Sequence, residues 1–131
     1  MSYTEFKDKS SVVLDSTNKD SSVTKVEVNY PEAHTGYVDV IDTGKYTGNA
    51  FNQRVINRMI LLDSKESFRD ATVHFKTPTN GKTLTVWQRL DLGLQKEVWI
   101  KLDSSFISND NKTATGSFKV TGKGLIMIAE E

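Results

Sequence analysis

Two histidines are the first residues to consider for chemistry, because the chain contains no cysteine that could act as a nucleophile or bind metal. A Ser-His-Asp triad needs a serine held in a defined turn beside the histidine. The chain has no Gly-x-Ser-x-Gly motif, which is the usual form of that turn in α/β-hydrolases. We therefore expect His34 to lie in a loop and His74 on the polar side of a strand, without a catalytic role.

Carboxylates and oxygen-rich loops give no stronger indication of chemistry. The chain has 17 acidic residues, and pairs such as Asp39 and Asp42 arise in any sheet protein, so they do not indicate a glycosidase. Residues 108–111, Ser-Asn-Asp-Asn, lack the turn glycine and the bidentate glutamate of an EF-hand calcium loop. Residues 122–124 lack the spacing of a phosphate-binding Walker loop. The sequence predicts no metal and no other cofactor.

The two tryptophans form the most informative pattern. Trp87 follows the alternating aliphatic residues Leu84 and Val86, so its side chain points to the opposite face of the strand. Trp99 likewise lies between aliphatic residues and points away from them. If residues 91–95 connect the two strands, both indoles are equally far from the centre of the connection. They then become direct cross-strand neighbours on a polar face.

The neighbours of the two indoles complete a polar and aromatic patch, in which Arg89 is expected to pair with Glu97. The residues predicted to bind a ligand or a partner are Thr85, Trp87, Arg89, Glu97, Trp99 and Lys101. Indole faces stack on sugar rings or cover a partner protein, and charged neighbours add directional hydrogen bonds. The alternative is that both tryptophans belong to the core or are covered by residues 51–62, since tryptophan is highly buried on average.

Period-two alternation is also the main pattern in the rest of the chain. Aliphatic or aromatic residues alternate with polar ones in short runs bounded by glycine, asparagine or proline. These runs are 26–30, 37–40, 73–75, 84–86, 98–102 and 118–120, and residues 11–14 add a short apolar run. Asn80-Gly81 is the strongest hairpin signal, because both residues tolerate the positive φ of a type I′ turn. The pattern predicts an all-β fold, either an antiparallel β-sandwich or a jelly-roll-like barrel.

One segment fits two descriptions. Over residues 49–63, a helix would place Phe51, Val55, Met59 and Leu62 on one face, with Asn49 as its N-cap. The aliphatic run that follows favours a strand over residues 58–63. We predict that strand, preceded by a turn or by one short helix near 49–58.

Composition limits the organisation of the chain and its binding partners. The 131 residues fit one domain, with residues 1–10 as a flexible polar segment and 11–131 as a single β domain. The 17 basic and 17 acidic side chains balance, so we expect no binding to nucleic acid or to an anionic membrane. No apolar run is long enough to span a membrane, and mean hydropathy is −0.45. No secretory signal is visible, so cytoplasmic synthesis is expected.

The leading functional hypothesis is a non-catalytic binding or assembly module. Residues 125–129 are apolar on both faces of their strand, so a second sheet or another subunit would have to cover one face. This predicts a homo-oligomer or association with other structural proteins. A Thr-, Ser- and Asn-rich chain without cysteine is also compatible with a virion component, such as a phage tail or baseplate part.

Two alternatives remain open at this stage. The first is a carbohydrate-binding module or lectin that uses an exposed pair of Trp87 and Trp99 to bind a glycan. The second is a small-ligand carrier or an enzyme. Its site would lie among Tyr37, Asp39, Arg58 and His74.

Overall fold

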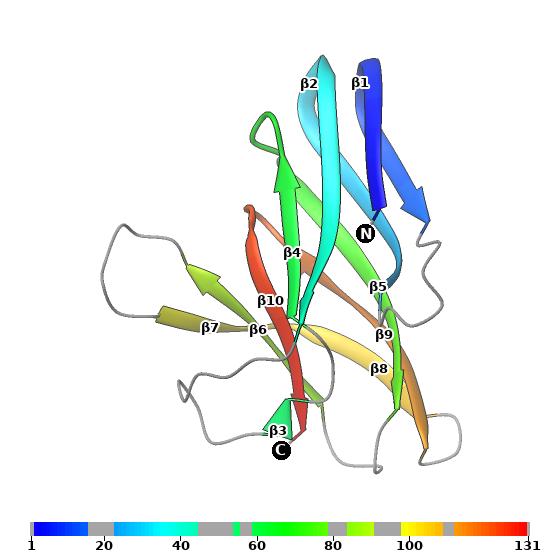
Figure 1. Cartoon of the computed structure of the whole chain (residues 1–131), viewed down its shortest axis with the longest axis vertical. Helices are drawn as coiled ribbons and strands as arrows, with labels where there is room; N and C mark the ends of the chain where they lie inside the picture. Colours follow the sequence, from blue (N-terminus) through cyan, green and yellow to red (C-terminus); the bar gives the residue numbers. More distant parts are fainter. Residues whose placement is uncertain are drawn as a thin grey trace.

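The chain folds into two antiparallel β-sheets that pack against each other without closing into a barrel (Figure 1). The structure is a computed structural model, and it describes residues 2–15, 23–44, 54–55, 59–78, 84–90, 98–108 and 112–130. These residues contain strands and no helix, which confirms the predicted all-β, sandwich-like class. The described part of the chain accordingly has no helix that could cross a membrane.

Within the described residues, ten strands make up the two sheets. In chain order they are β1 (Ser2–Asp15), β2 (Val23–Gly44), β3 (Arg54–Val55), β4 (Met59–Ser64), β5 (Asp70–Pro78), β6 (Leu84–Leu90), β7 (Val98–Leu102), β8 (Ser104–Ser108), β9 (Thr113–Val120) and β10 (Gly124–Glu130).

Both sheets share the strands β1 and β2. The first sheet has the order β7-β6-β10-β4, followed by the second half of β2 and the first half of β1, and β3 adds to β10. The second sheet has the order β8-β9-β5, followed by the first half of β2 and the second half of β1. The β1–β2 hairpin therefore folds over from one sheet to the other, as the blue and cyan strands show in Figure 1.

The fold-over has a clear physical cause. The 22 residues of β2 would extend to roughly 70 Å if they were straight, which is far longer than a typical strand. The β1–β2 pairing shifts register between Phe6 and Lys9 and again between Lys9 and Ser11. Asp8 adopts a φ of 57°, and its backbone N–H donates to Thr35 Oγ1 at 3.1 Å. Such bulges bend a strand and increase its twist.

The N-terminal residues differ from the prediction, because β1 begins at Ser2 instead of after a flexible segment of ten residues. Phe6 is only 8% exposed, and its ring contacts Tyr30 and His34. Residues 1–10 are mostly polar because an edge strand needs apolar side chains on only one face. Phe6 secures that face. The composition alone therefore does not distinguish this strand from a flexible segment.

The core lies between the two sheets and follows the predicted alternation. The first sheet contributes Val38, Val40, Leu84, Val86, Ile126 and Ile128. The second sheet contributes Val12, Leu14, Val26, Val28, Val73, Phe75, Phe118 and Val120. The polar residues between them point outward, as expected for strands with one buried face.

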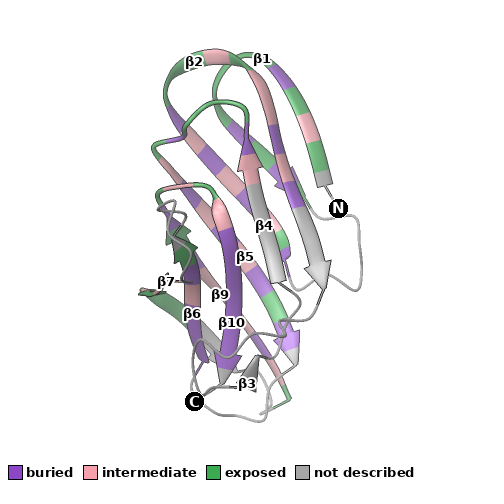
Figure 2. Cartoon of the chain, turned by 60° about the vertical axis from the view of Figure 1, so that its left-hand side comes forward, coloured by how far each residue is buried: buried purple, intermediate pink, exposed green. Residues whose placement is uncertain are grey.

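β10 is buried on both faces within the chain (Figure 2). Ile126 and Ile128 belong to the core, whereas Met127, on the opposite face, is 0% exposed. The strand lies between β6 and β4. The apolar side chains on both faces of β10 are therefore buried within one chain, so no second subunit is needed to cover them.

Two local predictions are corrected. β5 pairs with β2 and β9, and β6 pairs with β10 and β7, so Asn80-Gly81 does not close a hairpin between its flanking strands. Arg54 and Val55 form β3, which excludes a helix through those two residues of the 49–58 segment. The rest of that segment lies outside the described residues. The strand predicted over 58–63 is found as β4.

The role of β1 in the core gives a first prediction. Phe6→Ala should lower the free energy of unfolding by about 3–5 kcal/mol, because it removes a buried ring and leaves a cavity. Urea denaturation measures this value. Lys7→Ala is the matched control, since Lys7 is exposed. A loss below about 1 kcal/mol for Phe6→Ala would mean that residues 1–10 do not contribute to the core, as a flexible segment would not.

Candidate functional site

The β6–β7 hairpin carries the predicted tryptophan pair. Trp87 lies opposite Lys101, and Arg89 lies opposite Trp99. The two indoles are therefore diagonal neighbours, whereas the sequence predicted that they face each other directly. Residues directly opposite one another share a face of a sheet, so all four side chains lie on one face.

The difference in register follows from the length of the connection. Leu90 pairs with Val98, so residues 91–97 separate the paired ends instead of residues 91–95. A shift of two residues keeps every side chain on its original face, because the side-chain period of a strand is two. Arg89 consequently pairs with Trp99 and not with Glu97, which lies outside the described residues.

This face of the hairpin is turned away from the core. Val86 of β6 is fully buried, and Leu102 of β7 packs against the core cluster. On the opposite face, Arg89 and Lys101 are exposed, while Trp87 and Trp99 are half-buried. We call Trp87, Arg89, Trp99 and Lys101 the tryptophan patch.

Thr85 is part of the support for this patch and not of its surface. It is only 2% exposed, so it cannot touch a partner as the sequence predicted. Its Oγ1 accepts a hydrogen bond from Trp87 Nε1 at 3.1 Å and donates to the carbonyl of Ala129 at 3.4 Å. Thr85 therefore holds the indole ring in place by linking it to β10.

A second contact anchors β6 next to Arg89. The buried Gln88 side chain donates from Nε2 to the Gly122 carbonyl, at 2.9 Å, in the turn between β9 and β10. Gly124 has a φ of +156°, and a Cβ atom at this position would lie 3.1 Å from the Arg89 carbonyl oxygen. The glycine thus permits the close approach of β10 and β6 on which the patch depends.

A tyrosine and carboxylate cluster lies at the other edge of the same sheet, and of its members the sequence singled out only Tyr37 and Asp39. Tyr3 lies opposite Asp39, which lies opposite Asp63, and Glu5 lies opposite Tyr37. These five residues share one outer face, and we call them the tyrosine patch. The Tyr3 and Tyr37 rings stack at 5.5 Å. Three strands that are distant in sequence build the patch, so no local motif could reveal it.

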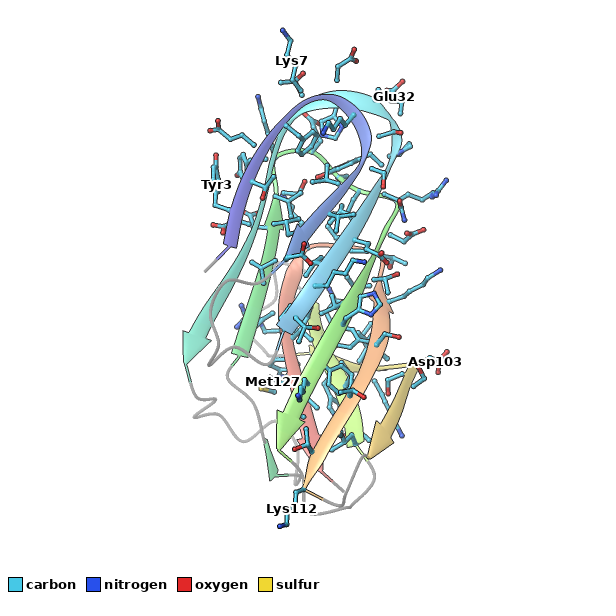
Figure 3. All side chains as sticks on the ribbon, turned by 90° about the vertical axis from the view of Figure 1, so that its right-hand side faces the viewer. Tyr3, Lys7, Glu32, Asp103, Lys112 and Met127 are labelled. Atoms are coloured by element: carbon cyan, nitrogen blue, oxygen red, sulfur yellow. The ribbon has the colours of Figure 1, made fainter. Side chains whose placement is uncertain are left out.

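Hydrogen bonds organise the tyrosine patch. Tyr3 donates its hydroxyl to Glu5 Oε1 at 3.1 Å, and Tyr37 donates its hydroxyl to Asp63 Oδ2 at 3.4 Å. Lys123 Nζ lies 4.0 Å from Asp63 Oδ1. A surface groove of about 450 Å³ borders the patch and is lined in part by Tyr3, Tyr37 and Lys65. Tyr3 is 51% exposed and projects from β1 (Figure 3).

Burial and neighbouring charges shift the pKa values of the titratable groups in the tyrosine patch. Burial and the neighbouring Asp63 carboxylate raise the pKa of Asp39 above its usual value. The same Asp63 carboxylate, together with burial, raises the pKa of Tyr37. Asp39 Oδ1 is buried and has no hydrogen-bond partner among the described residues. The N-terminal charge and the backbone N–H of Val40 act on the pKa of Asp39 in the opposite direction. Lys7 and Lys65 line the groove and Lys123 lies near Asp63, so cations surround the three carboxylates of the patch.

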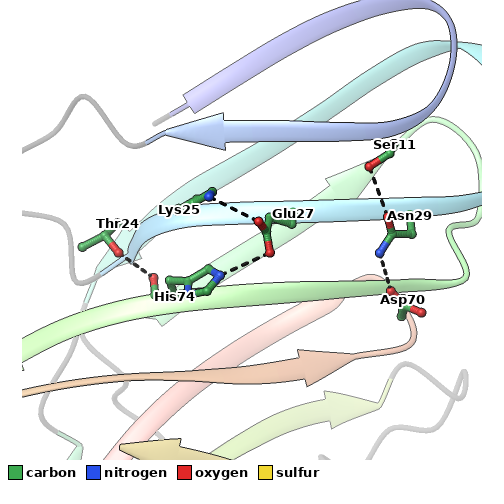
Figure 4. A network of polar contacts seen from close by, with 7 residues as sticks. All are labelled: Ser11, Thr24, Lys25, Glu27, Asn29, Asp70 and His74. Carbon is green, nitrogen blue, oxygen red and sulfur yellow. Dashed lines mark hydrogen bonds and ion pairs between the residues drawn. The ribbon is translucent and has the colours of Figure 1, made fainter. Parts of the chain in front are cut away.

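The outer face of the second sheet has a different character, because its charges pair with each other (Figure 4). Glu27 contacts Lys25 at 3.2 Å and His74 at 3.3 Å, and these hydrogen bonds lower the pKa of Glu27. Asn29 donates to Asp70 at 2.8 Å, and this bond lowers the pKa of Asp70. These contacts form a polar network on the outer face of the second sheet.

The proposed enzyme or carrier site does not assemble. Tyr37 and Asp39 lie on the outer face of the first sheet, whereas His74 lies on the outer face of the second, and Arg58 lies outside the described residues. His34 is at the bend of β2, packed against the Phe6 and Tyr30 rings. The two histidines therefore belong to separate regions.

Metal chemistry and known relatives give no further guidance. No group of three His, Asp or Glu residues in the described ranges is arranged to hold a metal ion. The oxygen-rich loop at 108–111 lies mostly outside those ranges. Comparison of the chain with protein-family models, curated protein sequences and solved structures finds no match.

The pKa of Asp39 is raised and that of Asp70 is lowered, so replacing each aspartate with asparagine should change the free energy of unfolding in opposite directions. A raised pKa makes the charged Asp39 unfavourable above that pKa, so Asp39→Asn should increase the free energy of unfolding at pH 7. A lowered pKa makes the charged Asp70 favourable, so Asp70→Asn should decrease it. Both differences should shrink as the pH falls and the wild-type carboxyls become protonated.

Urea denaturation at pH 7 and at about pH 3 measures these differences, and the two variants control for each other. The protein should be dilute, so that any association does not contribute. A destabilising Asp39→Asn substitution at pH 7 would contradict the assignment of an unfavourable charge at that position.

Proposed function

We propose that this protein is a non-catalytic structural subunit that self-associates, with the tryptophan patch as its main contact surface. The observation that carries the proposal is the pairing of β6 and β7, which brings two indoles and two cationic side chains onto one outer face. Tryptophan and arginine are the residue types most enriched at positions that dominate binding energy in protein interfaces. The composition suits a component of a larger assembly such as a virion.

The support of the patch also favours a binding role. Thr85 and Gln88 are buried polar residues whose side-chain hydrogen bonds fix β6 against β10 and the β9–β10 turn. The indole of Trp87 is thereby held in one orientation before any partner arrives. Less conformational entropy is then lost on association, which strengthens binding without new contacts.

The basis for self-association differs from the one expected from the sequence. The apolar residues of β10 are buried on both faces within one chain, so they provide no argument for a partner. The argument comes from the exposed Arg89 and Lys101 beside half-buried aromatic rings. Such a surface is typical of the rim and anchor positions of an interface.

Light scattering coupled to size-exclusion chromatography tests the proposal. The wild-type mass should exceed the 14.7 kDa of one chain and rise with concentration. Trp87→Ala should weaken the association by roughly thirtyfold or more, because truncating an aromatic anchor costs about 2 kcal/mol or more. Lys76→Glu is the control, since Lys76 is exposed on the second sheet. A wild-type monomer at every concentration would refute the proposal.

A carbohydrate-binding module is the second candidate. Two half-buried indoles on one sheet face, beside Arg89 and Lys101, also suit stacking on sugar rings with hydrogen bonds from charged neighbours. This candidate predicts that a glycan changes the tryptophan fluorescence in a saturable way and that Trp87→Ala abolishes the change. The absence of a response across a broad glycan panel would exclude it.

A further inference from the structure

We propose that the second half of β1, residues 11–15, pairs with the same segment of a second copy of the chain. The two segments run antiparallel about a two-fold axis at Val13, so that the second sheets of the two copies join edge to edge. This contact goes beyond the proposed function, because it lies on the second sheet and uses no residue of the tryptophan patch.

Residues 11–15 form an open edge of the second sheet. Among the described residues, β1 pairs with β2 alone, so one side of this segment has no neighbouring strand. In an antiparallel edge strand, alternate residues direct their backbone N–H and C=O groups away from the sheet. Such a row of unpaired groups is a template for a further strand.

The two halves of β1 differ in how they are protected against such pairing. The first half carries charges at Glu5, Lys7, Asp8 and Lys9, and its pairing with β2 is interrupted by register shifts at the bend. Charged side chains and bulges are the usual devices that keep edge strands apart. Residues 10–14, Ser-Ser-Val-Val-Leu, contain no charge and no proline, and the pairing over residues 11–15 is regular. The second half therefore lacks this protection.

Val13 gives the open half an apolar contact point. Its side chain is 52% exposed, whereas Val12 and Leu14 on either side of it belong to the core. In an antiparallel pair centred on Val13, the Val13 side chains of the two copies are direct cross-strand neighbours. A contact between two β-branched side chains at this position is favourable, and it removes both from water.

The positions of the charges and of the bulge select the register. With the centre at Val13, all five residues pair, and Asp15 of one copy lies opposite Ser11 of the other. A centre at Asp15 would set two carboxylates directly opposite each other, which is unfavourable. A centre closer to the N-terminus would bring the irregular pairing between Lys9 and Ser11 into the contact.

Side-chain hydrogen bonds hold the start of this edge in place. Ser11 Oγ donates to Asn29 Oδ1 at 3.1 Å, and Asn29 Nδ2 donates to Asp70 Oδ1 at 2.8 Å (Figure 4). These bonds link β1 through β2 to β5. Less conformational entropy is lost when a partner strand binds to an edge that is already ordered.

Disulfide trapping tests the contact directly, because the chain has no cysteine of its own. The background is the full-length chain with Trp87→Ala, which removes the aromatic anchor of the tryptophan patch. Here Val13→Cys should give a disulfide-linked dimer in a glutathione redox buffer. Opposed Cα atoms of an antiparallel pair are about 4.5–5.5 Å apart, which is within the range of about 4.4–6.8 Å that a disulfide requires.

Lys7→Cys in the same background is the matched control. Lys7 is exposed on the same strand, but it lies on the far side of the bend from Val13, so its copies are not brought together. Its yield of linked dimer should be lower by about tenfold or more, since a disulfide forms only between closely placed Cα atoms. Non-reducing electrophoresis measures both yields, and circular dichroism with thermal melting shows that each variant is folded.

A second pair of variants tests the axis without cysteine chemistry. In the Trp87→Ala background, Val13→Lys should raise the dissociation constant by about tenfold, because it removes an apolar pair and sets two like charges opposite each other. Val13→Thr keeps a β-branched, uncharged side chain and should change the constant much less. Sedimentation velocity measures both values, and equal constants for the two variants would contradict an axis at Val13.

The outcomes separate this contact from the proposed function. Equal dimer yields for Val13→Cys and Lys7→Cys would refute the edge pairing and leave the tryptophan patch untouched. A linked Val13→Cys dimer, in a chain whose association does not respond to Trp87→Ala, would support the edge pairing and refute the tryptophan patch as the main contact. If Val13→Cys instead links to a copy that carries Ser105→Cys, β1 pairs with β8, and the two-fold contact is refuted.

Discussion

The structure depends on the bend in the β1–β2 hairpin. β2 supplies core residues to both sheets, with Val26 and Val28 in one and Val38 and Val40 in the other. These residues can face each other only because the strand turns back on itself between them. Tyr30 lies in the bend, and its hydroxyl lies 2.7 Å from that of Ser64, which is almost fully buried and donates to the Glu66 carbonyl. The same bend places the first half of β1 at the edge of the first sheet, next to the second half of β2.

The position of β10 determines where the protein can interact. A strand that is apolar on both faces must be covered on both, and here the chain itself covers them. Surface available for binding is therefore found at the edges of the first sheet, on β6–β7 and on β1–β2. Each edge carries aromatic rings together with charged side chains, which are cationic on β6–β7 and of both signs on β1–β2.

Local patterns in the sequence predict local structure well in this protein and long-range geometry poorly. Alternation identifies the strands and the inward residues, because burial of one face acts on each strand separately. The register of β6 and β7 depends on residues 91–97, whose connection length the sequence does not determine. The role of Phe6 is obscured by polar neighbours and by the bulge near Asp8, where φ is 57°. The tyrosine patch joins Tyr3, Asp39 and Asp63, so it exists only once the strand order is known.

The two outer faces differ in how well their carboxylates are satisfied by neighbouring groups. On the second sheet, neighbouring side chains satisfy the charged groups, as Asn29 does for Asp70, and this pairing contributes favourably to the folded chain. On the first sheet, Asp39 has an unfavourable charge, and a buried oxygen of its side chain has no partner in the described structure. Replacing this carboxylate with a neutral side chain would relieve the penalty within an isolated chain. The N-terminal charge and the backbone N–H of Val40 oppose this penalty, but burial and the Asp63 carboxylate outweigh them, so the pKa of Asp39 remains raised.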